Sequence, residues 1–364
     1  MKDKHQTWGI IPIFVSHLGC PHDCAFCNQK KITGISDAIK PEALEDYVMD
    51  YLTTMKRDHI ELAFFGGSFT GIEASRQIAY LKVAQELKAK GLIHAIRLST
   101  RPDYMDSQIA ERLKEHGVDL VELGVQSFSN AVLKASKRGH EVDAVLEAVE
   151  QLKRVGIDFG IQLMLGLPMD SYDQFMVSVK RTIELKPQCV RLYPALVIRG
   201  TALEMSYDKG HYAPLELEMA VKWASEAYQL FESAGIPVIR LGLQRTDLID
   251  FDGDVLAGPF HPAFGELVIS ACYLSAIKCI IDERISGSEM AYESLIIEVP
   301  EKGLSKALGQ KRDNLIQLEN NYGKTIKSII IKGTHDVSAP NFRCVFVGTA
   351  HREVVWGSIL NFEV

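Results

Sequence analysis

Two kinds of segment alternate through the first two-thirds of the chain, and this alternation restricts the fold more than any other feature. Short runs rich in β-branched and other apolar residues are typical of strands buried in a parallel sheet. They occupy residues 10–18, 60–67, 95–100, 120–127, 158–167 and 189–198. Segments with helical periodicity and charged outer faces occupy residues 40–55, 75–91, 106–117, 143–156, 171–186 and 215–235. Six strand–helix units in series predict a parallel α/β sheet with right-handed crossovers.

The periodicity is compatible with both a doubly wound sheet and an open barrel. Polar or glycine-containing sequences follow five of the strands, namely GCPHDC, GGSFT, TRPDY, QSFSN and GLPMD. The loops after the carboxyl ends of parallel strands lie along one edge of the sheet, where α/β proteins bind their ligands. The five sequences therefore predict a single ligand-binding rim.

The alternation stops near residue 245, which predicts a first domain over residues 1–245 and a smaller α+β domain over residues 246–364. A long apolar helix is expected to open the second domain. Further strands are expected at 292–300, 325–333, 342–349 and 354–362, with two helices and a basic junction between them at 302–323.

Composition is that of a soluble globular protein, with 364 residues, 47% hydrophobic and 24% charged. We see no apolar run approaching the ~20 residues of a membrane span, and we expect no membrane partner. The first ten residues lack the apolar stretch of a signal peptide, which predicts a cytoplasmic protein. A net charge of −7 argues against a broad basic surface for nucleic acid, but it leaves room for a local basic patch.

Three of the seven cysteines, Cys20, Cys24 and Cys27, lie within the stretch LGCPHDCAFCNQ that follows the first expected strand. In a reducing compartment such a group is more often metal-binding or catalytic than disulfide-bonded. Three thiolates hold three corners of a 4Fe–4S cluster and leave one iron open, whereas structural zinc normally takes four ligands. The spacing therefore favours a cluster with an open site.

A fourth protein ligand is available in principle from His17, from His22 or from the remaining four cysteines. Those cysteines, Cys189, Cys272, Cys279 and Cys344, stand in apolar runs, so we expect them to be buried packing residues. They are too scattered to bind a second cluster. A structural zinc site stays open as an alternative.

The pattern C-x3-C-x2-C with Phe26 before the third cysteine resembles the signature of the radical S-adenosylmethionine (radical SAM) enzymes. The stretches FFGGSFT, TRPDY, ELGVQSF, KRGH, LMLGLP and VIRGTALE, within residues 10–205, resemble the radical SAM half of the Elongator catalytic subunit family. No counterpart of that family's acetyltransferase half is visible. A weaker resemblance, through GVQSF and GLP, is to the oxygen-independent coproporphyrinogen oxidase family.

The resemblance implies an open (β/α)6 barrel of the partial TIM type, a 4Fe–4S cluster and S-adenosylmethionine (SAM) as cofactors, and an electron donor such as flavodoxin or ferredoxin. In the family, SAM chelates the open iron and is reductively cleaved to methionine and a 5′-deoxyadenosyl radical. The cofactors carry this chemistry, and the protein supplies position and electrostatics. No catalytic residue for the substrate is predicted.

The same resemblance assigns SAM contacts on the rim. Gly66 and Gly67 match the glycine pair near the SAM amino group, where only glycine allows so close a backbone approach. Gln126 matches a ribose-contacting residue. Arg138 matches an arginine near the SAM carboxylate, to which a guanidinium is well suited. The alternatives are a plain strand-to-loop glycine pair, an inward-facing glutamine satisfied by its neighbours and a solvated arginine.

Two further residues, Thr100 in STRPDY and Gln162 in QLMLGLP, are predicted to line the cofactor site by the same resemblance. At the position of Gln162, coproporphyrinogen-oxidase-like proteins carry an aspartate for the ribose hydroxyls. At the position of Ser99, Elongator-like proteins typically carry a glutamate, so any role of a carboxylate there does not transfer to this chain.

Residues 292–333 are predicted to run strand–helix–loop–helix–strand and resemble the KH RNA-binding module, whose G-x-x-G loop clamps a nucleic-acid backbone. Here the loop is GQKR, in which Gly309 is present and Arg312 replaces the second glycine. Lys311 and Arg312 would face phosphates at the start of a helix. The alternative is a small α+β lid with a solvated basic loop.

Two functions remain open from the sequence. The first is a radical SAM enzyme acting on tRNA or another RNA, as the Elongator resemblance implies. The second is a coproporphyrinogen-oxidase-like enzyme or a heme-chaperone-like cluster protein that binds a tetrapyrrole or another small molecule. Reductive cleavage of SAM is expected for the first function and not for a chaperone.

Overall fold

The structure is a computed structural model that describes residues 7–15, 24–28, 38–243, 249–250, 252–286, 292–349 and 351–360. The chain forms two compact units. The first contains residues 1–216 and 243–260, and the second contains residues 217–242 and 261–364. The sequence predicted a boundary at residue 245. In the structure, the segment 217–242 belongs to the second unit instead of the first.

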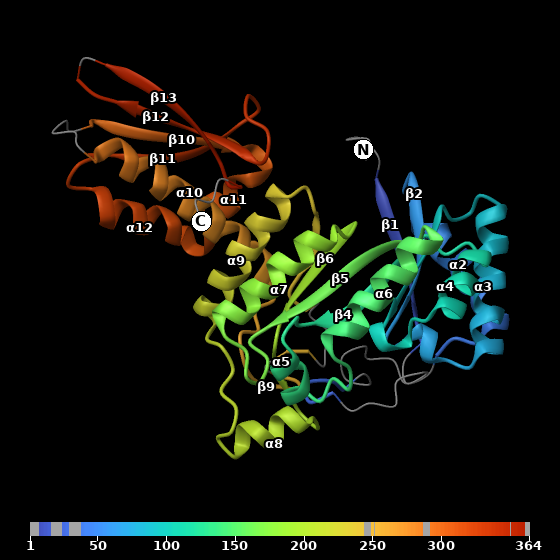
Figure 1. Cartoon of the computed structure of the whole chain (residues 1–364). Helices are drawn as coiled ribbons and strands as arrows, with labels where there is room; N and C mark the ends of the chain where they lie inside the picture. The colour runs from blue at the N-terminus through green and yellow to red at the C-terminus, as the bar shows by residue number, and fades with distance from the viewer. Residues whose placement is uncertain are drawn as a thin grey trace. The chain divides into compact units, whose positions relative to one another are not determined.

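The first unit supplies six parallel strands, in chain order, to a seven-stranded sheet. They are β1 (Trp8–Phe14), β2 (His59–Phe65), β3 (Ala95–Thr100), β4 (Leu120–Gln126), β5 (Asp158–Leu165) and β6 (Cys189–Pro194). Each matches one of the six predicted strands. The sheet curls as a partial TIM-type barrel, which confirms the predicted fold class (Figure 1).

The connecting helices are α2 (Leu44–Thr54), α3 (Ala74–Ala89), α4 (Ser107–Glu115), α6 (Val142–Val155) and α7 (Tyr172–Leu185). Local sequence sets several of their ends. Asp106 caps α4 by accepting a hydrogen bond from the backbone N–H of Ile109 (2.8 Å), and Gly156 ends α6 in the left-handed conformation with φ 67°.

Shorter elements of the first unit were not predicted. They are α5 (Asn130–Ala135), α8 (Ala202–Asp208), the antiparallel pair β7 (Val197–Ile198) and β9 (Val255–Ala257), and the 3-10 turns η1 (Pro41–Ala43), η2 (Phe69–Gly71) and η3 (Pro102–Tyr104). Most of them follow the carboxyl ends of strands, where they build the rim.

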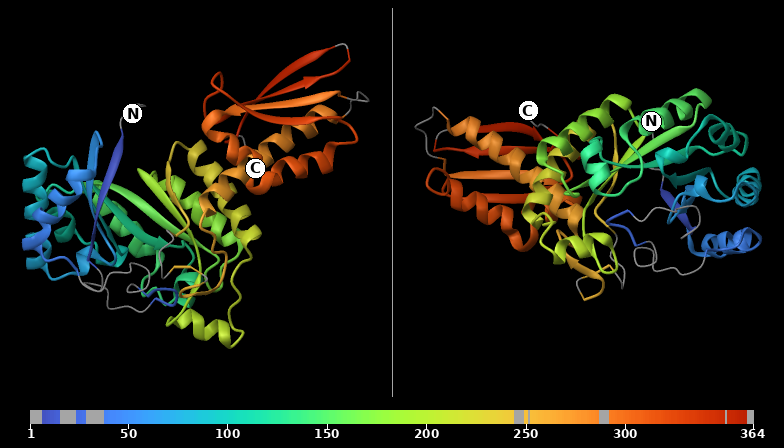
Figure 2. Two further views of the ribbon diagram at one scale, coloured as in Figure 1. Left: turned by 180° about the vertical axis from the view of Figure 1, so that it is seen from behind. Right: turned by 60° about the horizontal axis from the view of Figure 1, so that its bottom comes forward.

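The two faces of the first sheet differ. Figure 1 shows α6 and α7 in front of the sheet, and the rear view in Figure 2 shows β2 to β5 without a helix across them. Alternate strand residues such as Leu62, Ile96 and Leu123 are fully buried on the helix-covered side. Ser99 and Gln162, on the opposite face, are only half-buried. Helices therefore cover one face of the sheet, as in an open barrel, because a curled sheet keeps its inner face open.

The second unit contains α9 (Leu217–Ser233), β8 (Val238–Leu241) and α10 (Phe264–Ile285). Its four-stranded sheet has the order β11-β10-β12-β13, with β11 parallel to β10 and the other pairs antiparallel. The strands are β10 (Ser294–Pro300), β11 (Ile329–Thr334), β12 (Asn341–Val347) and β13 (Arg352–Ser358). Between β10 and β11 lie η4 (Glu301–Gly303), α11 (Leu304–Leu308), η5 (Gln310–Arg312) and α12 (Asp313–Tyr322), which is the predicted strand–helix–loop–helix–strand order.

Helix α10 has 22 residues and a mean hydropathy of 1.7, so by length and composition alone it would be able to cross a membrane. The sequence predicted a long apolar helix here, but no run that approaches the ~20 residues of a membrane span. The helix is part of the second unit's core, where Cys272, Ile277 and Ile281 are buried against residues of the four-stranded sheet. This packing explains part of its apolar character, since 44% of its most apolar stretch is buried.

Candidate functional site

The cysteine loop is described from Cys24 to Asn28, whereas Cys20, His17 and His22 lie outside the described residues. Cys24 is buried and Cys27 is half-buried, with a hydrogen bond from the Cys27 N–H to the Cys24 carbonyl (3.0 Å). The Ala25 N–H donates to the carbonyl of Ser136 (2.9 Å), and the Ala25 carbonyl accepts from Leu203 (2.7 Å). The loop is thus attached to the end of α5 and to the start of α8.

Phe26 anchors the same loop through its side chain. Its ring packs against two apolar clusters, one containing Val132 and Met164 and the other containing Leu203 and Tyr212. Phe26 was predicted to be near the cofactor, and the contacts of its ring show that it holds the loop between α5, β5 and α8. The aromatic residue before the third cysteine therefore has a clear structural role here.

Two buried arginines face the sulfur of Cys24. The Nη1 atom of Arg138 lies 3.3 Å from this sulfur, and the Nη1 atom of Arg101 lies 3.7 Å from it. Arg101 also forms a two-pronged ion pair with Asp103, with distances of 3.0 and 2.8 Å, and donates to the Arg138 carbonyl. Arg101 was not predicted as a site residue, although the TRPDY motif that contains it was recognised.

Arg138 is 7% exposed and has no carboxylate partner among the described residues. Its Nη2 atom donates to the carbonyl of Gly124, and its Nε atom has no partner in the described part of the chain. The alternative of a solvated arginine is therefore wrong. A buried guanidinium is costly unless a negative group or hydrogen-bond acceptors compensate it, so this site suits an anionic partner beside Cys24.

Strand β4 shapes the space around Arg138. A Cβ atom on Gly124 would lie 2.8 Å from Nη2 of Arg138 and 3.0 Å from Nε2 of Gln126, so glycine is needed for these side chains to approach the strand. Gln126 ends the strand with φ 72° and is buried. Its Oε1 atom accepts a hydrogen bond from Nε2 of Gln162 (3.1 Å). The structure thus brings Gln126, Gln162 and Arg138 together, as the single-rim prediction required.

Thr100, Gly66 and Gly67 lie at the carboxyl ends of β3 and β2. The hydroxyl of Thr100 is bonded to the hydroxyl of Thr70 (2.5 Å), and Thr70 also reaches the carbonyl of Tyr104 (2.6 Å). The hydroxyl of Thr100 is therefore hydrogen-bonded to another side chain of the rim. Gly66 has φ 86°, a conformation that favours glycine and turns the chain sharply after β2.

His140 follows the arginine in the KRGH sequence and is buried. Its burial, assisted by the positive charge of Arg138, lowers its pKa to about 4. At neutral pH this ring is uncharged, so Arg101 and Arg138 are the cations described beside Cys24.

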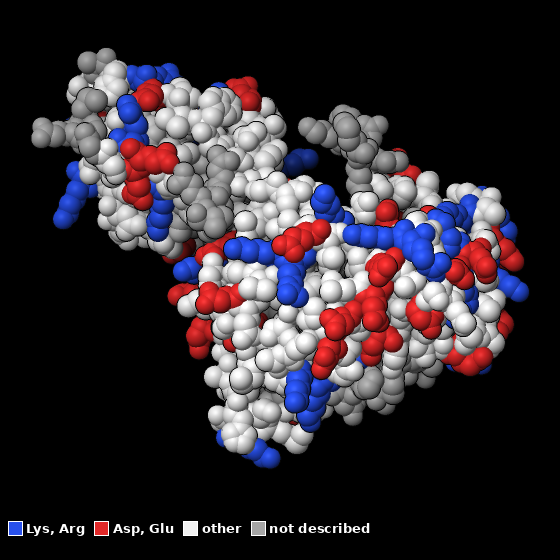
Figure 3. Space-filling model, viewed as in Figure 1, with Lys and Arg blue, Asp and Glu red and all other residues white. Residues whose placement is uncertain are grey.

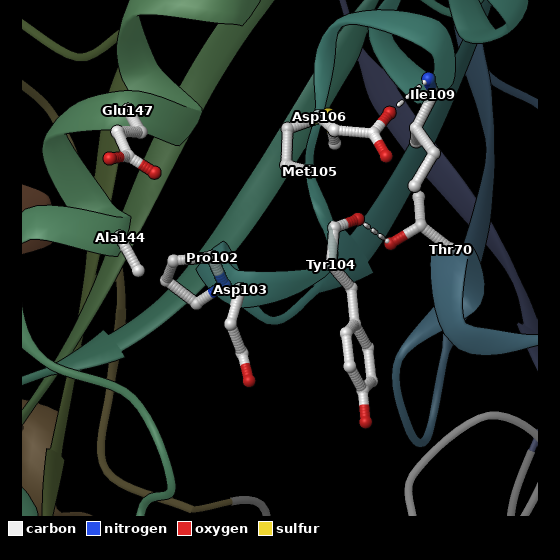
Figure 4. A pocket seen from close by; sticks show the side chains of 9 residues that line it. All are labelled: Thr70, Pro102, Asp103, Tyr104, Met105, Asp106, Ile109, Ala144 and Glu147. Carbon is white, nitrogen blue, oxygen red and sulfur yellow. Dashed lines mark hydrogen bonds between the residues drawn. The ribbon is translucent and has the colours of Figure 1, made fainter.

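A cavity of about 350 Å³ lies beside this network, between the segment from η3 to the start of α4 and helix α6 (Figure 4). Its lining includes Thr70, Asp103, Asp106 and Glu147. Asp103 forms an ion pair with Arg101, and Asp106 caps α4. The cavity holds none of the predicted site residues, and Asp103 and Asp106 serve the surrounding structure.

An ionic layer crosses the inner face of the sheet and was missed by the sequence analysis. Arg97 on β3 pairs with Glu61 (2.6 Å) and with Glu122 on β4 (2.9 Å). Glu122 also pairs with Arg191 on β6, whose Nη1 atom donates to the Tyr193 hydroxyl (3.3 Å). Burial lowers the pKa of Arg191, but the charge of Glu122 more than offsets it, so the pKa is raised overall. Single charged residues within apolar strands gave the only signal of this layer.

The other cysteines do not join the loop. Cys189 is buried on β6, where its sulfur lies 3.9 Å from Nη2 of Arg97. Cys272 and Cys344 are buried in the second unit, and burial raises both thiol pKa values to about 12. Cys279 is exposed, with its sulfur 3.5 Å from Oε1 of Glu283, so the prediction that it is buried is wrong. The described residues contain no group of three His, Cys, Asp or Glu side chains suited to a metal ion.

The predicted RNA-binding loop lies in the second unit. Gly309, Lys311 and Arg312 all have positive φ values of 78°, 51° and 66°. Asn314 stabilises the turn, since its Nδ2 atom donates to the carbonyls of Ala307 (3.1 Å) and Ser270 (3.0 Å). Arg312 therefore adopts a conformation that glycine reaches easily, at the position where the KH loop carries its second glycine.

Comparison with known proteins agrees with this geometry. Residues 14–181 match the Radical SAM superfamily model, and residues 187–273 match the Radical_SAM C-terminal domain. The tRNA uridine(34) acetyltransferase of Methanocaldococcus infernus is 29% identical over 334 residues, covering 80% of this chain and 61% of that protein. The heme chaperone HemW of Lactococcus lactis is 24% identical over 181 residues, covering 49% of this chain and 47% of HemW.

Among solved structures, the archaeal Methanocaldococcus infernus Elp3 with an N-terminal deletion has a TM-score of 0.58 and 24% identity. The match covers 73% of this chain and 62% of that one, and it shows a shared fold. The chain spans about three-fifths of the length of the curated relatives it matches first.

The first unit combines a curled parallel sheet with a cysteine loop on its carboxyl rim. The chain belongs to the radical SAM superfamily, whose two family models match residues 14–181 and 187–273. The expected family resemblance is thereby confirmed. The family implies a 4Fe–4S cluster and SAM as cofactors.

The described residues fit a cluster at this loop. The sulfur of Cys24 is buried but faces two guanidinium groups, one of which lacks a carboxylate partner in the described part of the chain. Hydrogen bonds from cations to sulfur stabilise a thiolate ligand and adjust the potential of the metal that it holds.

Proposed function

We propose that this radical SAM enzyme holds a 4Fe–4S cluster on Cys20, Cys24 and Cys27, binds SAM on the adjacent rim and modifies tRNA or another RNA. The observation that carries the cluster assignment is the buried pair of Arg101 and Arg138 beside the Cys24 sulfur. When bound in this family, cluster and SAM together supply a one-electron reductive cleavage that yields methionine and the 5′-deoxyadenosyl radical.

The residues of this chain would bind the cluster and SAM and orient them. Arg138 is placed to stabilise the thiolate of Cys24 and to attract a carboxylate, and the Gln126–Gln162 pair offers amide groups for hydroxyl partners. The bend at Gly66 would let the SAM amino group approach the backbone after β2 closely. These roles support the predicted SAM contacts, while Thr100 supports the rim through its bond to Thr70.

The RNA substrate is supported by the names of three relatives, which are tRNA uridine(34) acetyltransferases. Lys311 and Arg312 in the glycine-like turn of the second unit are proposed to contact phosphates. The proposal includes a flavodoxin- or ferredoxin-like electron donor and a cytoplasmic location, where a reducing environment keeps thiols available for a cluster.

The cluster assignment is tested by anaerobic reconstitution. The wild-type protein is expected to be brown with roughly four irons per chain, as a 4Fe–4S cluster requires. Replacing Cys20, Cys24 and Cys27 together by alanine should remove the colour and the iron, while the matched replacement of Cys272, Cys279 and Cys344 should keep both. Iron retained by the first variant would contradict the assignment.

The similarity to HemW favours a second candidate, a heme-binding cluster protein. The two functions separate in one experiment with reconstituted protein, SAM, a strong reductant and heme. Formation of 5′-deoxyadenosine without stable heme binding supports the RNA-modifying enzyme. Heme binding without 5′-deoxyadenosine supports the chaperone.

A further inference from the structure

A second cavity of the first unit, of about 230 Å³, lies against the cysteine loop. It is formed by the loop itself, the end of α5, the turn after β5, and α8 with the residues that follow it. Its lining consists of Ala25, Ala135, Lys137, Pro168, Ala202, Met205, Ser206, Lys209, His211 and Tyr212. None of the functions described above uses this cavity.

The cavity combines apolar and polar lining residues with two lysines at its rim. Lys137 and Lys209 are exposed, and neither forms a salt bridge within the described part of the chain. Met205, which is 57% exposed, lines the same space, and Met169, which is 72% exposed, follows the lining residue Pro168. Figure 3 shows Lys or Arg side chains over α5 and at the lower end of α8, with a largely uncharged surface between them.

The backbone ties this cavity to the cluster site. Ala25 lies next to Cys24, and it lines the cavity while its backbone bonds to Ser136 and Leu203. Lys137 and Arg138 are consecutive, yet Lys137 lines the cavity and Arg138 reaches the Cys24 sulfur. The left-handed conformation of Lys137, with φ 51°, is part of the turn that separates the two side chains. A ligand in the cavity would therefore contact Ala25 and Lys137, which are the sequence neighbours of Cys24 and Arg138 at the proposed cluster site.

We propose that this cavity binds a nucleotide of a single-stranded RNA substrate, next to the base that is presented to the cluster site. Lys137 and Lys209 would neutralise its phosphates, and apolar lining residues such as Met205 would contact an unstacked base. A concave site favours an inserted nucleotide over the convex surface of a protein partner. The protein's net charge of −7 makes this basic rim a local exception. The inference rests on the proposed RNA substrate.

The test uses anaerobically reconstituted full-length protein and an unmodified tRNA transcript, with affinity measured by filter binding over a range of salt concentrations. Each phosphate contact on a single strand adds ~0.7 to the log–log salt slope, so Lys137→Ala with Lys209→Ala should lower the slope by about 1.4 and the affinity by about 25-fold at ~0.1 M salt. The matched control is Lys82→Ala with Lys180→Ala, two exposed lysines on α3 and α7 that do not line the cavity. SAM binding, measured separately, should be unchanged in both variants.

Each outcome decides the proposal. Loss of slope in the cavity variant alone supports it. Equal slopes in the wild type, the cavity variant and the control overturn the cavity assignment and leave RNA modification standing. A wild type that binds no tRNA overturns the RNA substrate itself. A fourth result is also informative: RNA binding is unchanged in the cavity variant, while its cluster is reduced more slowly by reduced flavodoxin but at the normal rate by dithionite. The cavity would then bind an acidic electron donor, and its assignment to RNA would be wrong.

Discussion

Asp170, in the GLPMD turn after β5, shows how one side chain couples the rim to pH. Its oxygens accept hydrogen bonds from the backbone N–H groups of Gly166 and Ser171, both at 3.0 Å. Burial nevertheless raises its pKa to about 6, against about 3.9 for an unfolded aspartate. The folded protein therefore binds this proton more tightly than the unfolded chain does.

The consequence is a loss of stability as pH rises. Between about pH 4 and pH 6 the folded state holds a proton that the unfolded state has released, so the free energy of unfolding falls with increasing pH. The full penalty, about 3 kcal/mol, is present at pH 7 and above. Asp170→Asn removes this titration, so its stability relative to the wild type should rise by about 3 kcal/mol from pH 4 to pH 7. Urea unfolding at several pH values measures this, and parallel pH profiles would contradict it.

At the scale of the strand, Glu122 on β4 links β3 and β6 across the inner face. It is 4% exposed and pairs with both Arg97 and Arg191. Removing one partner of a buried ionic network leaves uncompensated charge, which costs roughly 3–5 kcal/mol. Glu122→Ala should therefore destabilise the first unit by about that amount, as measured by denaturant unfolding.

The exposed pair of Glu111 and Arg154 provides a matched control, because both side chains are about half exposed. Glu111→Ala should cost less than about 1 kcal/mol, as is usual for surface ion pairs. Similar losses in the two variants would show that the layer on the inner face contributes no more than a surface salt bridge.

At the scale of the whole molecule, the turn at 309–312 is predicted to contact RNA separately from the cofactor site in the first unit. Lys311→Ala with Arg312→Ala should lower the salt slope of tRNA binding by about 1.4, since two single-strand phosphate contacts are lost. SAM binding should continue, because the changed residues lie in another compact unit. The control Lys324→Ala with Arg352→Ala alters exposed residues of the same unit and should preserve the slope. Equal slopes would favour the solvated-lid interpretation.

The sequence by itself determined the elements and the class of chemistry. The six strands, their order along the chain and the cysteine spacing follow from local patterns, because apolar periodicity and ligand spacing are properties of neighbouring residues. Arg138 was identified by the same kind of motif, and its burial excluded the solvated alternative. The KRGH and TRPDY motifs did not show that Arg101 and Arg138 converge on one sulfur.

Only the tertiary structure decided which residues meet. Parallel strands bring Glu61, Arg97, Glu122 and Arg191 side by side across more than a hundred residues of sequence. The cavity beside Ala25 likewise needs α8, a short helix whose position is set by the bond from Leu203 to Ala25 rather than by its own periodicity. Long-range contacts depend on how the sheet curls and where its loops close, and this is a property of the packed chain as a whole.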